Sequence, residues 1–363
     1  METMLAARYL GPHRVESQEV SVPEIGNDEA LIEVEACGFC GSDINIIAGT
    51  HPRAKAPLTL GHELSGRIIE LRSSGTPFAI GDRVTTYPLI SCGECYACTH
   101  RYPHVCKDLK LYGFDVDGGM AQFVKLPVSS LIKLPDGMSA RIGALIEPLA
   151  VAVHGVARAK LDQVKLAVVL GAGPIGLLTA LVAQARGIPQ VIISDVLTTR
   201  KQFAETLGLR AVEAGENLRQ LVMELSGQNG ADLLFECAGH PSSALEMSGL
   251  VRSRGVIVNL GVFKKPVPVD MQAINFKEIE VLGSRVYERK DFETAIGLAT
   301  NLPLERIVTH AYSLHDVSAA FEQFRSGEVC KVLILPWKAH DNPNGAGMAV
   351  EVGSRVEIVL GEV

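Results

Sequence analysis

Four cysteines lie within sixteen residues of one segment, "SCGECYACTHRYPHVC", and their spacing is Cys-x2-Cys-x2-Cys-x7-Cys. The four are Cys92, Cys95, Cys98 and Cys106. Four thiolates fill a tetrahedral zinc site and leave no position for a substrate, so the spacing predicts a structural zinc ion. An iron–sulfur cluster or a rubredoxin-like iron site is the main alternative for a four-thiolate set.

A second set of potential ligands precedes this cluster, in the segments "CGFCGSDIN" and "LGHELSG". Cys40, His62 and Glu63 offer one soft, one borderline and one hard ligand, and three protein ligands plus water form the open type of zinc site. Each residue alone is weak evidence, because a lone cysteine is usually a small core residue and a His-Glu pair is usually on the surface. Together, the four-cysteine set and this second set predict two zinc ions per chain.

The other cysteines have simpler interpretations. Cys37 and Cys40 form a second Cys-x-x-Cys, but Cys37 ends an apolar segment and a redox pair there would compete with zinc binding. Cys237 and Cys330 lie in apolar segments and are predicted to be core residues.

Composition limits the classes of protein that remain. The 363 residues are 47% hydrophobic with a net charge of -7, which suits two domains with real cores and excludes a disordered chain. The charge does not suggest nucleic-acid binding, and we expect no signal peptide and no membrane span. A cytoplasmic location is expected, where clustered cysteines hold metal more often than disulfides.

The segment "KLAVVLGAGPIGLLTALVAQARG" predicts a strand, a glycine turn and a helix, and "QVIISDV" predicts the next strand. The turn contains Gly171, Gly173, Pro174, Ile175 and Gly176. Its glycines allow a tight turn and close approach of a pyrophosphate to the helix N-terminus. Asp195 lies 19 residues beyond Gly176, where a carboxylate accepts the ribose hydroxyls of NAD and repels the 2'-phosphate of NADP. The pattern predicts an NAD-binding unit.

Further strands are predicted in "ADLLFECAG", "GVIVNLGV" and "IEVLGSRV", with helices between them. This alternation predicts an α/β fold with a doubly wound parallel sheet, whereas residues 1–128 read as short strands broken by Gly and Pro. The alternating segment from Val350 to Leu360 predicts either an added edge strand or a flexible extension.

Taken together, the motifs "GHELSG", "CGECYACTHRYPHVC", "DVDGGMAQFV", "IEPLAVAVHG" and "GAGPIG" resemble the zinc-dependent medium-chain dehydrogenases from about Met4 to Pro336. The resemblance implies a GroES-like β catalytic domain and a Rossmann coenzyme domain, with the active site between them. It places the catalytic domain at residues 1–148 and 287–363, with a zinc lobe at 88–110, and the coenzyme domain at 149–286.

The resemblance also assigns roles to single residues. Glu147 stands where ethanol-type members have another cysteine, as in polyol, sugar-acid and threonine dehydrogenases, so the implied catalytic set is Cys40, His62, Glu63 and Glu147. The resemblance allows each of the two glutamates to bind zinc directly or through the zinc-bound water. The alternative for Glu147 is a partly buried, ion-paired acid ahead of Pro148 at a helix start.

Ser42 is implied to pass the alcohol proton outward, with capping of a helix near Asp43 as its alternative. Many relatives have a histidine five residues after the zinc cysteine, but here that position is Asn45, which cannot titrate near neutral pH. His51 is the possible substitute.

Two arginines complete the implied site. Arg200 is implied to cover the adenine of the coenzyme, with a solvent-facing position on a helix as its alternative. Arg285 is implied to point toward the nicotinamide or the substrate, with a surface ion pair as its alternative.

The sequence thus favours an enzyme that oxidises a secondary alcohol of a polyol, sugar acid or related small molecule with NAD. An L-threonine or small-diol dehydrogenase is the alternative, and a non-enzymatic zinc- and NAD-binding protein is a third hypothesis. The expected partners are a small-molecule substrate and further copies of the chain, as a dimer or tetramer.

Overall fold

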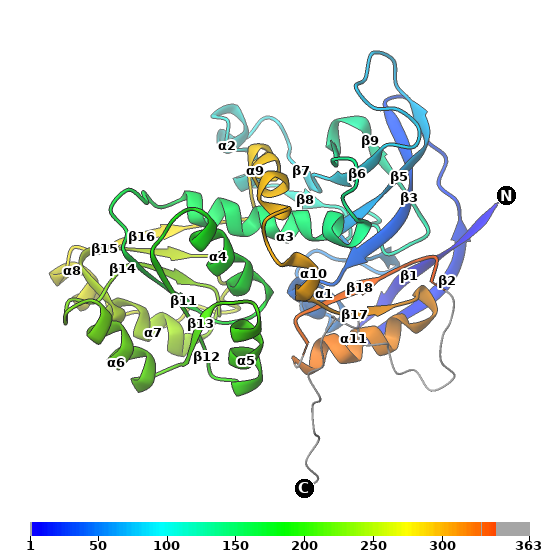
Figure 1. The fold of residues 1–363 in the computed structure, drawn as a ribbon. Helices are drawn as coiled ribbons and strands as arrows, with labels where there is room; N and C mark the ends of the chain where they lie inside the picture. Colours follow the sequence, from blue (N-terminus) through cyan, green and yellow to red (C-terminus); the bar gives the residue numbers. More distant parts are fainter. Residues whose placement is uncertain (1, 328, 339–363) are drawn as a thin grey trace, which may run out of the picture.

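The computed structural model describes residues 2–327 and 329–338, so the segment Val350–Leu360 lies outside the described residues. A β-rich half contains the N-terminal residues and the last described strands, and a second half alternates strands with helices (Figure 1). Helix α3 (Ala140–Ala157) runs between the two halves. The domain boundaries at residues 148 and 286 stay a prediction; α3 passes through the first of them.

The β-rich half is built on one seven-stranded sheet. Its order is β10-β6-β5-β3-β18-β17, with β9 also paired to β3, while β2-β1-β4 and β7-β8 form smaller sheets. Its strands are β1 (Thr3–Gly11), β2 (Arg14–Ser21), β3 (Glu29–Gly38), β4 (Leu58–Thr59), β5 (Glu63–Arg72), β6 (Arg83–Thr86), β7 (Leu89–Ile90), β8 (Lys110–Leu111), β9 (Phe123–Pro127), β10 (Leu131–Lys133), β17 (Val308–Tyr312) and β18 (Lys331–Ile334). Its helices are α1 (Gly41–Ile47), α2 (Tyr96–Thr99), α10 (Leu304–Ile307) and α11 (Val317–Ser326), with short 3-10 turns η1 (Pro103–Val105), η2 (Val128–Ser130) and η3 (Leu314–Asp316).

The second half is the predicted parallel sheet, in the order β13-β12-β11-β14-β15-β16. Its elements are β11 (Leu166–Leu170), α4 (Pro174–Ala185), β12 (Gln190–Asp195), α5 (Thr198–Thr206), β13 (Arg210–Glu213), α6 (Glu216–Leu225), β14 (Ala231–Glu236), α7 (Pro241–Leu250), β15 (Val251–Asn259), α8 (Met271–Phe276) and β16 (Glu280–Gly283), and α9 (Arg289–Ala299) follows. All five residues of β11 are buried, as expected for a central parallel strand covered by helices on both faces. The α/β class and the doubly wound sheet are confirmed.

Helix α3 is the common wall of the two halves. It packs against α4 of the half that contains the parallel sheet, and against β5 and α9. The Ser139 hydroxyl caps the start of α3 by accepting from the Ile142 amide at 3.2 Å. Among the described residues it is also the one helix with the length and apolarity of a membrane span. Because 72% of that stretch is buried inside the protein, α3 has the character of a core helix.

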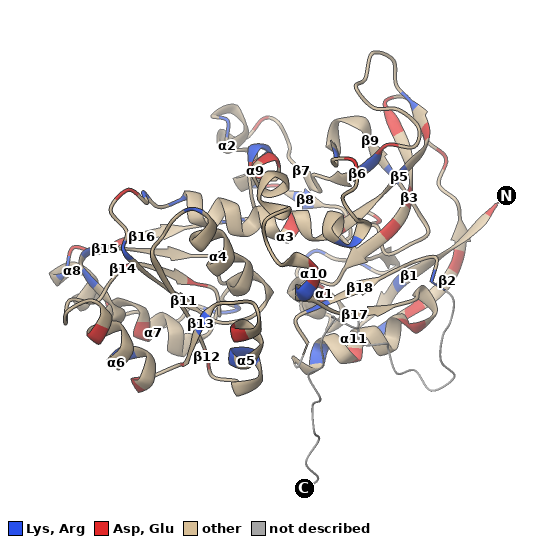
Figure 2. Cartoon of the chain, viewed as in Figure 1, with Lys and Arg blue, Asp and Glu red and all other residues tan. Residues whose placement is uncertain are grey.

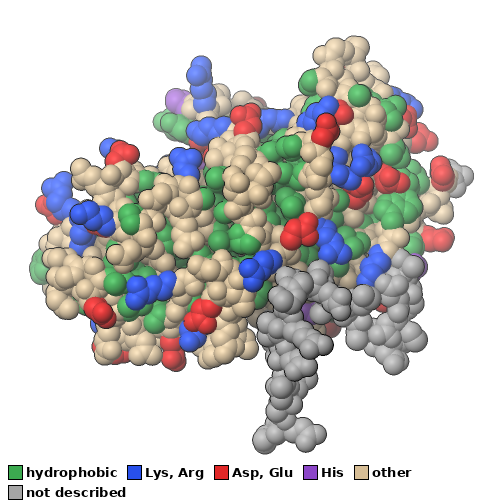
Figure 3. Space-filling view, in the orientation of Figure 1, with side chains coloured by type: hydrophobic (Ala, Val, Ile, Leu, Met, Phe, Trp, Pro, Cys, Tyr) green, Lys and Arg blue, Asp and Glu red, His purple; other side chains and the backbone are tan. Residues whose placement is uncertain are grey.

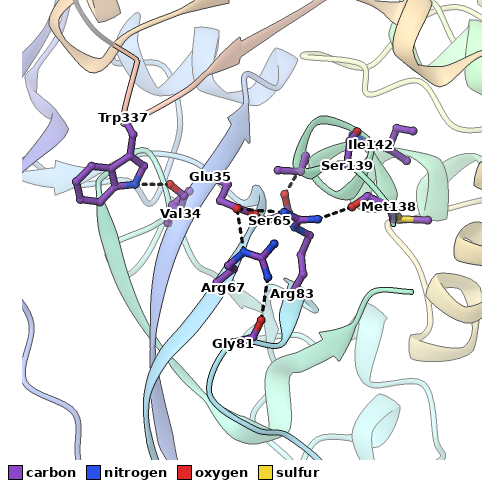
Figure 4. Close-up of polar contacts among 11 residues, drawn as sticks. Val34, Glu35, Ser65, Arg67, Gly81, Arg83, Met138, Ser139, Ile142 and Trp337 are labelled. Carbon is purple, nitrogen blue, oxygen red and sulfur yellow. Dashed lines mark hydrogen bonds and ion pairs between the residues drawn. The ribbon is translucent and has the colours of Figure 1, made fainter. Parts of the chain in front are cut away.

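A polar network fixes the β-rich sheet beside the start of α3 (Figure 4). Glu35 of β3 accepts from Arg67 Nε of β5 at 3.2 Å and from Arg83 Nε of β6 at 2.8 Å. Arg83 also donates to the Met138 carbonyl at 2.8 Å, just ahead of α3. One carboxylate therefore links three strands to the position of the helix that carries Glu147.

Charged residues are spread over both halves of the fold, with Lys and Arg interspersed among Asp and Glu along the ribbon (Figure 2). The face shown in Figure 3 has the same mixture, broken by small apolar areas. This distribution agrees with the modest net charge of -7.

Candidate functional site

The four clustered thiols meet in the lobe formed by β7, α2, η1 and β8. Their sulfur atoms lie 3.4 Å apart for Cys92 and Cys106, 3.6 Å for Cys95 and Cys98, and 3.9 Å for the pairs Cys92–Cys98 and Cys95–Cys106. A tetrahedral zinc with Zn–S bonds of about 2.3 Å places its sulfur atoms about 3.8 Å apart. These separations are far longer than a disulfide bond of about 2.05 Å. The lobe therefore fits a four-thiolate metal ion.

The lobe also lowers the cost of forming thiolates. Backbone N–H groups of Cys98 and Lys107 point at the Cys95 sulfur and lower its pKa to about 6. Partial burial and the neighbouring sulfurs, Cys95 first, raise the pKa of Cys98 to about 11. Cys95 thus forms a thiolate readily, whereas the Cys98 thiol needs a cation among the sulfurs to lose its proton.

The second ligand set is assembled by strand register. Strands β3 and β5 are antiparallel with Gly38 opposite Glu63, so Cys40, two residues past β3, comes next to His62, one residue before β5. Cys40 is the N-cap of α1, where its backbone N–H donates to Asp43 Oδ2 at 2.9 Å. The ligand atoms of Cys40, His62 and Glu63 all lie within 4.8 Å of one another. The register therefore brings together donors separated by more than twenty residues of sequence.

Lys331 is a further charged residue at this site, and no sequence motif indicated it. It begins β18, which pairs with β3 on the side away from β5. Its ammonium donates to both carboxylate oxygens of Glu63, at 2.6 and 2.8 Å, and to the Phe39 carbonyl at 2.9 Å. The Lys331 and Glu63 side chains are each only 2% exposed. A lysine inside the apolar segment "CKVLILP" was the available signal.

Gly38 makes this ion pair possible. The Glu63 carboxylate reaches across Gly38 of β3 toward β18, and a Cβ atom at position 38 would collide with Glu63 Oε2. Lys331 donates to both oxygens of Glu63, so the ion pair fixes the carboxylate, while the start of β5 fixes the backbone of this residue.

The electrostatics of the pocket call for a cation. Burial by itself would lower the pKa of His62, but Cys40, Glu147 and Asp43 around it raise that pKa to about 10. The Asp43 Oδ1, His62 Nδ1 and Ser42 Oγ atoms are buried and have no hydrogen-bond partner among residues 2–327 and 329–338. Negative groups therefore surround a histidine, a thiol and a carboxylate whose ligand atoms are mutually close, and this donor set fits zinc.

Glu147 lies near this cluster but outside the group of three mutually close ligand atoms. It is 4% exposed and sits in the middle of α3, so the alternative that placed it at a helix start is wrong. Burial, and then the nearby Glu63, raise its pKa to about 7, against the opposing effect of His62. The buried Tyr287 hydroxyl is close to the Glu147 carboxylate without reaching hydrogen-bond geometry.

Ser42 and His51, the two polar residues considered for proton transfer, lie close to the ligand set, and Ser42 is not the helix cap that was its alternative role. Helix α1 begins at Gly41 with Cys40 as its cap, so Ser42 lies inside the first turn and does not cap the helix. His51 Nδ1 accepts from the Ala54 amide at 3.1 Å, and its ring packs on Phe114, 5.1 Å between centroids. Phe114 in turn contacts the His62 ring at 4.9 Å. A proton relay through Ser42 stays a prediction.

Cys37 and Cys330 agree with the packing interpretation, whereas Cys237 is partly buried and packs against the core from its edge. Cys37 is fully buried in β3 and Cys330 is 7% exposed. Cys237 and Cys330 stand one residue outside β14 and β18, respectively, and not within these strands.

The coenzyme-type turn has the predicted order of strand, glycine turn, helix and strand. Gly171 has φ +97°, and a Cβ at Gly176 would collide with the Gly171 carbonyl, so both positions require glycine. Helix α4 begins at Pro174, directly after Gly173. Asp195 ends β12, and its oxygens accept from the Ala172 amide at 2.8 Å and the Leu197 amide at 2.9 Å.

The two predicted arginines occupy different places. Arg200 donates to the Gly327 carbonyl at 3.2 Å and lies 3.7 Å from the Asp195 carboxylate, so it spans from α5 to the end of α11. Arg285 follows β16 and lines a cavity together with residues of the cysteine lobe and α3. None of the three clustered ligands Cys40, His62 and Glu63 lines that cavity.

Comparison with known proteins assigns both halves. Residues 26–136 match the family model of the alcohol dehydrogenase GroES-like domain, and residues 174–301 match that of zinc-binding dehydrogenase.

Curated relatives cover nearly the whole chain. A sorbitol dehydrogenase of Halalkalibacterium halodurans is 38% identical over 88% of this chain and 95% of its own length. A 2-dehydro-3-deoxy-L-galactonate 5-dehydrogenase of Pseudoalteromonas atlantica is 35% identical, with 88% and 94% covered. An L-threonine 3-dehydrogenase of Bacillus licheniformis is 34% identical, with 87% and 94% covered.

Solved structures agree with the fold. A putative zinc-binding dehydrogenase from Sinorhizobium meliloti bound to NADP has a TM-score of 0.85 at 30% identity, covering 93% of this chain and all of that one. Galactitol-1-phosphate dehydrogenase from Escherichia coli has a TM-score of 0.85 at 27% identity, covering 92% of this chain and 100% of that one.

Proposed function

Since the chain belongs to the zinc-dependent medium-chain alcohol dehydrogenases, we propose that it oxidises a secondary alcohol of a polyol or sugar acid to a ketone with NAD. The observation that carries the proposal is the cluster of Cys40, His62 and Glu63, with carboxylates in place of further thiolates. The relatives that act on sorbitol and on a sugar acid support this substrate class.

We propose that zinc is held by Cys40 and His62, with Glu63 and Glu147 as the carboxylates next to it. Bound there, zinc is a Lewis acid that lowers the pKa of the substrate alcohol. Cys40 and His62 fix its position through the register of β3 and β5, while Lys331 holds the Glu63 carboxylate at the site's edge. Glu147 and Glu63 present acceptors for neighbouring substrate hydroxyls, and Ser42 is the first candidate to receive the alcohol proton.

The coenzyme is proposed to bind at the turn from Gly171 to Gly176. The Asp195 carboxylate is fixed by two backbone amides, and each oxygen keeps capacity to accept from a ribose hydroxyl. Its negative charge opposes a 2'-phosphate, which favours NAD. Arg200, 3.7 Å from the Asp195 carboxylate, partly offsets that charge.

The experiment is NADH formation by the zinc-loaded protein with sorbitol, galactitol, aldonates, L-threonine, 2,3-butanediol and ethanol. Polyhydroxy or sugar-acid substrates should lead the series in kcat/KM, because unpaired buried acceptors cost about 1 to 3 kcal/mol each. A series led by threonine or butanediol supports the alternative substrate class, which the threonine dehydrogenase relative favours. A series led by ethanol contradicts both.

We further propose that the enzyme is a cytoplasmic homo-oligomer of two or four chains. The edge strand β16 and the preceding helix α8 expose apolar side chains, with Val281 45%, Met271 65% and Phe276 77% exposed. Sedimentation equilibrium tests the assembly, and a monomer at micromolar concentration contradicts it.

A further inference from the structure

A cavity of about 370 Å³ lies where the cysteine lobe, α3 and the ends of β15 and β16 meet. In Figure 1 these are the segments around α2, the middle helix α3 and the strands labelled β15 and β16. The lining residues that bear on its chemistry are His104, His154, Arg158, Ser284 and Arg285. The lining contains two arginines and two histidines and no acidic residue.

Two buried histidines form one side of this cavity. His104 is 6% exposed and His154 is 5% exposed, and their rings lie 5.1 Å apart between centroids. His154 Nδ1 is held by Asp291 Oδ2 at 2.8 Å, which fixes the ring. In the part of the chain that the structure describes, neither His104 Nδ1 nor the buried Ser284 hydroxyl has a hydrogen-bond partner. Two polar groups at the cavity are therefore left unsatisfied.

The two arginines supply charge on the exposed side. Arg158 follows the last residue of α3, and its Nε donates to the Gly283 carbonyl at 3.0 Å, so the guanidinium is oriented beside β16. Within the described residues no hydrogen bond or ion pair occupies the Arg285 guanidinium. Both arginine side chains are exposed. Five N–H donors at Arg285 are thus free for a ligand.

We propose that this cavity binds an anionic group, a carboxylate or a phosphate, between Arg285 and Arg158, with Ser284 and His104 as further hydrogen-bonding groups. Guanidinium groups bind such oxyanions in a two-pronged way, and among the described residues no carboxylate is part of the lining itself. The same two arginines oppose binding of a metal cation. The charges that reach His104 from neighbouring elements are His154, Arg158, Glu288 and Asp291. Asp291 is paired with His154, and Glu288 with Lys290 at 2.8 Å.

The anion has two possible sources. Glu147 and His154 lie on one face of α3, seven residues and about 10 Å apart along the helix, so this distance is what a substrate would have to span from the metal site to the cavity. The anionic end of the substrate is one source, and a separate small anion is the other. Binding at the cavity does not depend on which alcohol is oxidised.

The direct test is calorimetric titration of the zinc-loaded protein with inorganic phosphate. We expect saturable binding that Arg285→Ala weakens at least about tenfold, with Arg285→Lys intermediate because it keeps the charge and loses the fork. Arg210→Ala is the matched control, since Arg210 is an exposed arginine on β13 at the opposite edge of the same sheet. Absence of saturable binding, or equal affinity in wild type and Arg285→Ala, overturns the proposal.

Kinetics then separates the two sources. Competition of phosphate with an acid-bearing substrate, but not with a neutral polyol, identifies the cavity as the subsite for the substrate's own anion. If phosphate binds but kcat/KM is unchanged for the acid-bearing substrate and for the neutral polyol, the cavity binds a small anion that is not part of the substrate. If no alcohol in the panel is oxidised, the proposed function fails while the phosphate titration still reports on the cavity.

Discussion

Replacing Lys331 by methionine should destabilise the protein by about 3 kcal/mol. The substitution removes one partner of an ion pair whose side chains are both 2% exposed and whose closest N–O distance is 2.6 Å. Loss of one partner from a buried pair typically costs about 3 to 5 kcal/mol, because the other charge stays buried without compensation. The lower end applies here, since zinc bound beside Glu63 offsets part of its charge.

Trp337 provides the assay for this change. It is the single tryptophan of the chain, it follows β18 closely, and its indole donates to the Val34 carbonyl of β3 at 3.0 Å (Figure 4). Its emission therefore reports on the contact between the β18 end of the chain and β3 during urea unfolding. The variants are Lys331→Met, Glu63→Gln and the double substitution.

The double variant decides the interpretation. If the pair acts as described, Lys331→Met and Glu63→Gln together should be less harmful than the sum of the two, with a coupling energy of at least about 2 kcal/mol. A loss below about 1 kcal/mol for Lys331→Met with no coupling would refute the reasoning. Gly38→Ala should reproduce part of the loss, because its Cβ displaces the Glu63 carboxylate from Lys331.

Three further predictions concern metal, coenzyme and acid stability. Elemental analysis should find two zinc ions per chain; Cys95→Ser should lose one with a large fall in the thermal midpoint, and a single ion in the wild-type protein contradicts this. Asp195→Ala should reduce kcat/KM with NAD more than with NADP, from a wild-type preference of at least about tenfold, or about 1.4 kcal/mol; equal wild-type efficiencies overturn the assignment. Burial raises the pKa of Glu35, but Arg83 and Arg67 outweigh it and hold that pKa below its ordinary value. The stabilisation is therefore present above the unfolded pKa and is lost as pH falls through the folded one, so Glu35→Gln should cost about 1 kcal/mol at pH 7 and progressively less as urea titrations are repeated at lower pH.

Several features could be predicted because they depend on local sequence. The turn at Gly171 and Gly176 requires residues without a side chain, and the apolar segments around it show the period of strands and helices. The four cysteines of the lobe are close in sequence, so their spacing alone indicates a common ligand. These patterns were sufficient for the α/β class, the mainly β first part and the metal-binding lobe.

Other features depend on which strands become neighbours, and the sequence does not record this. Lys331 meets Glu63, 268 residues away, only because β18 pairs with one side of β3 and β5 with the other. Arg285, Arg158 and His104 share a cavity only because α3 carries one half of the fold against the cysteine lobe. Spacing along the chain was therefore enough to identify the local motifs. Which charges face each other was decided by long-range strand pairing and helix packing, because segments far apart in sequence come into contact only once the backbone has folded.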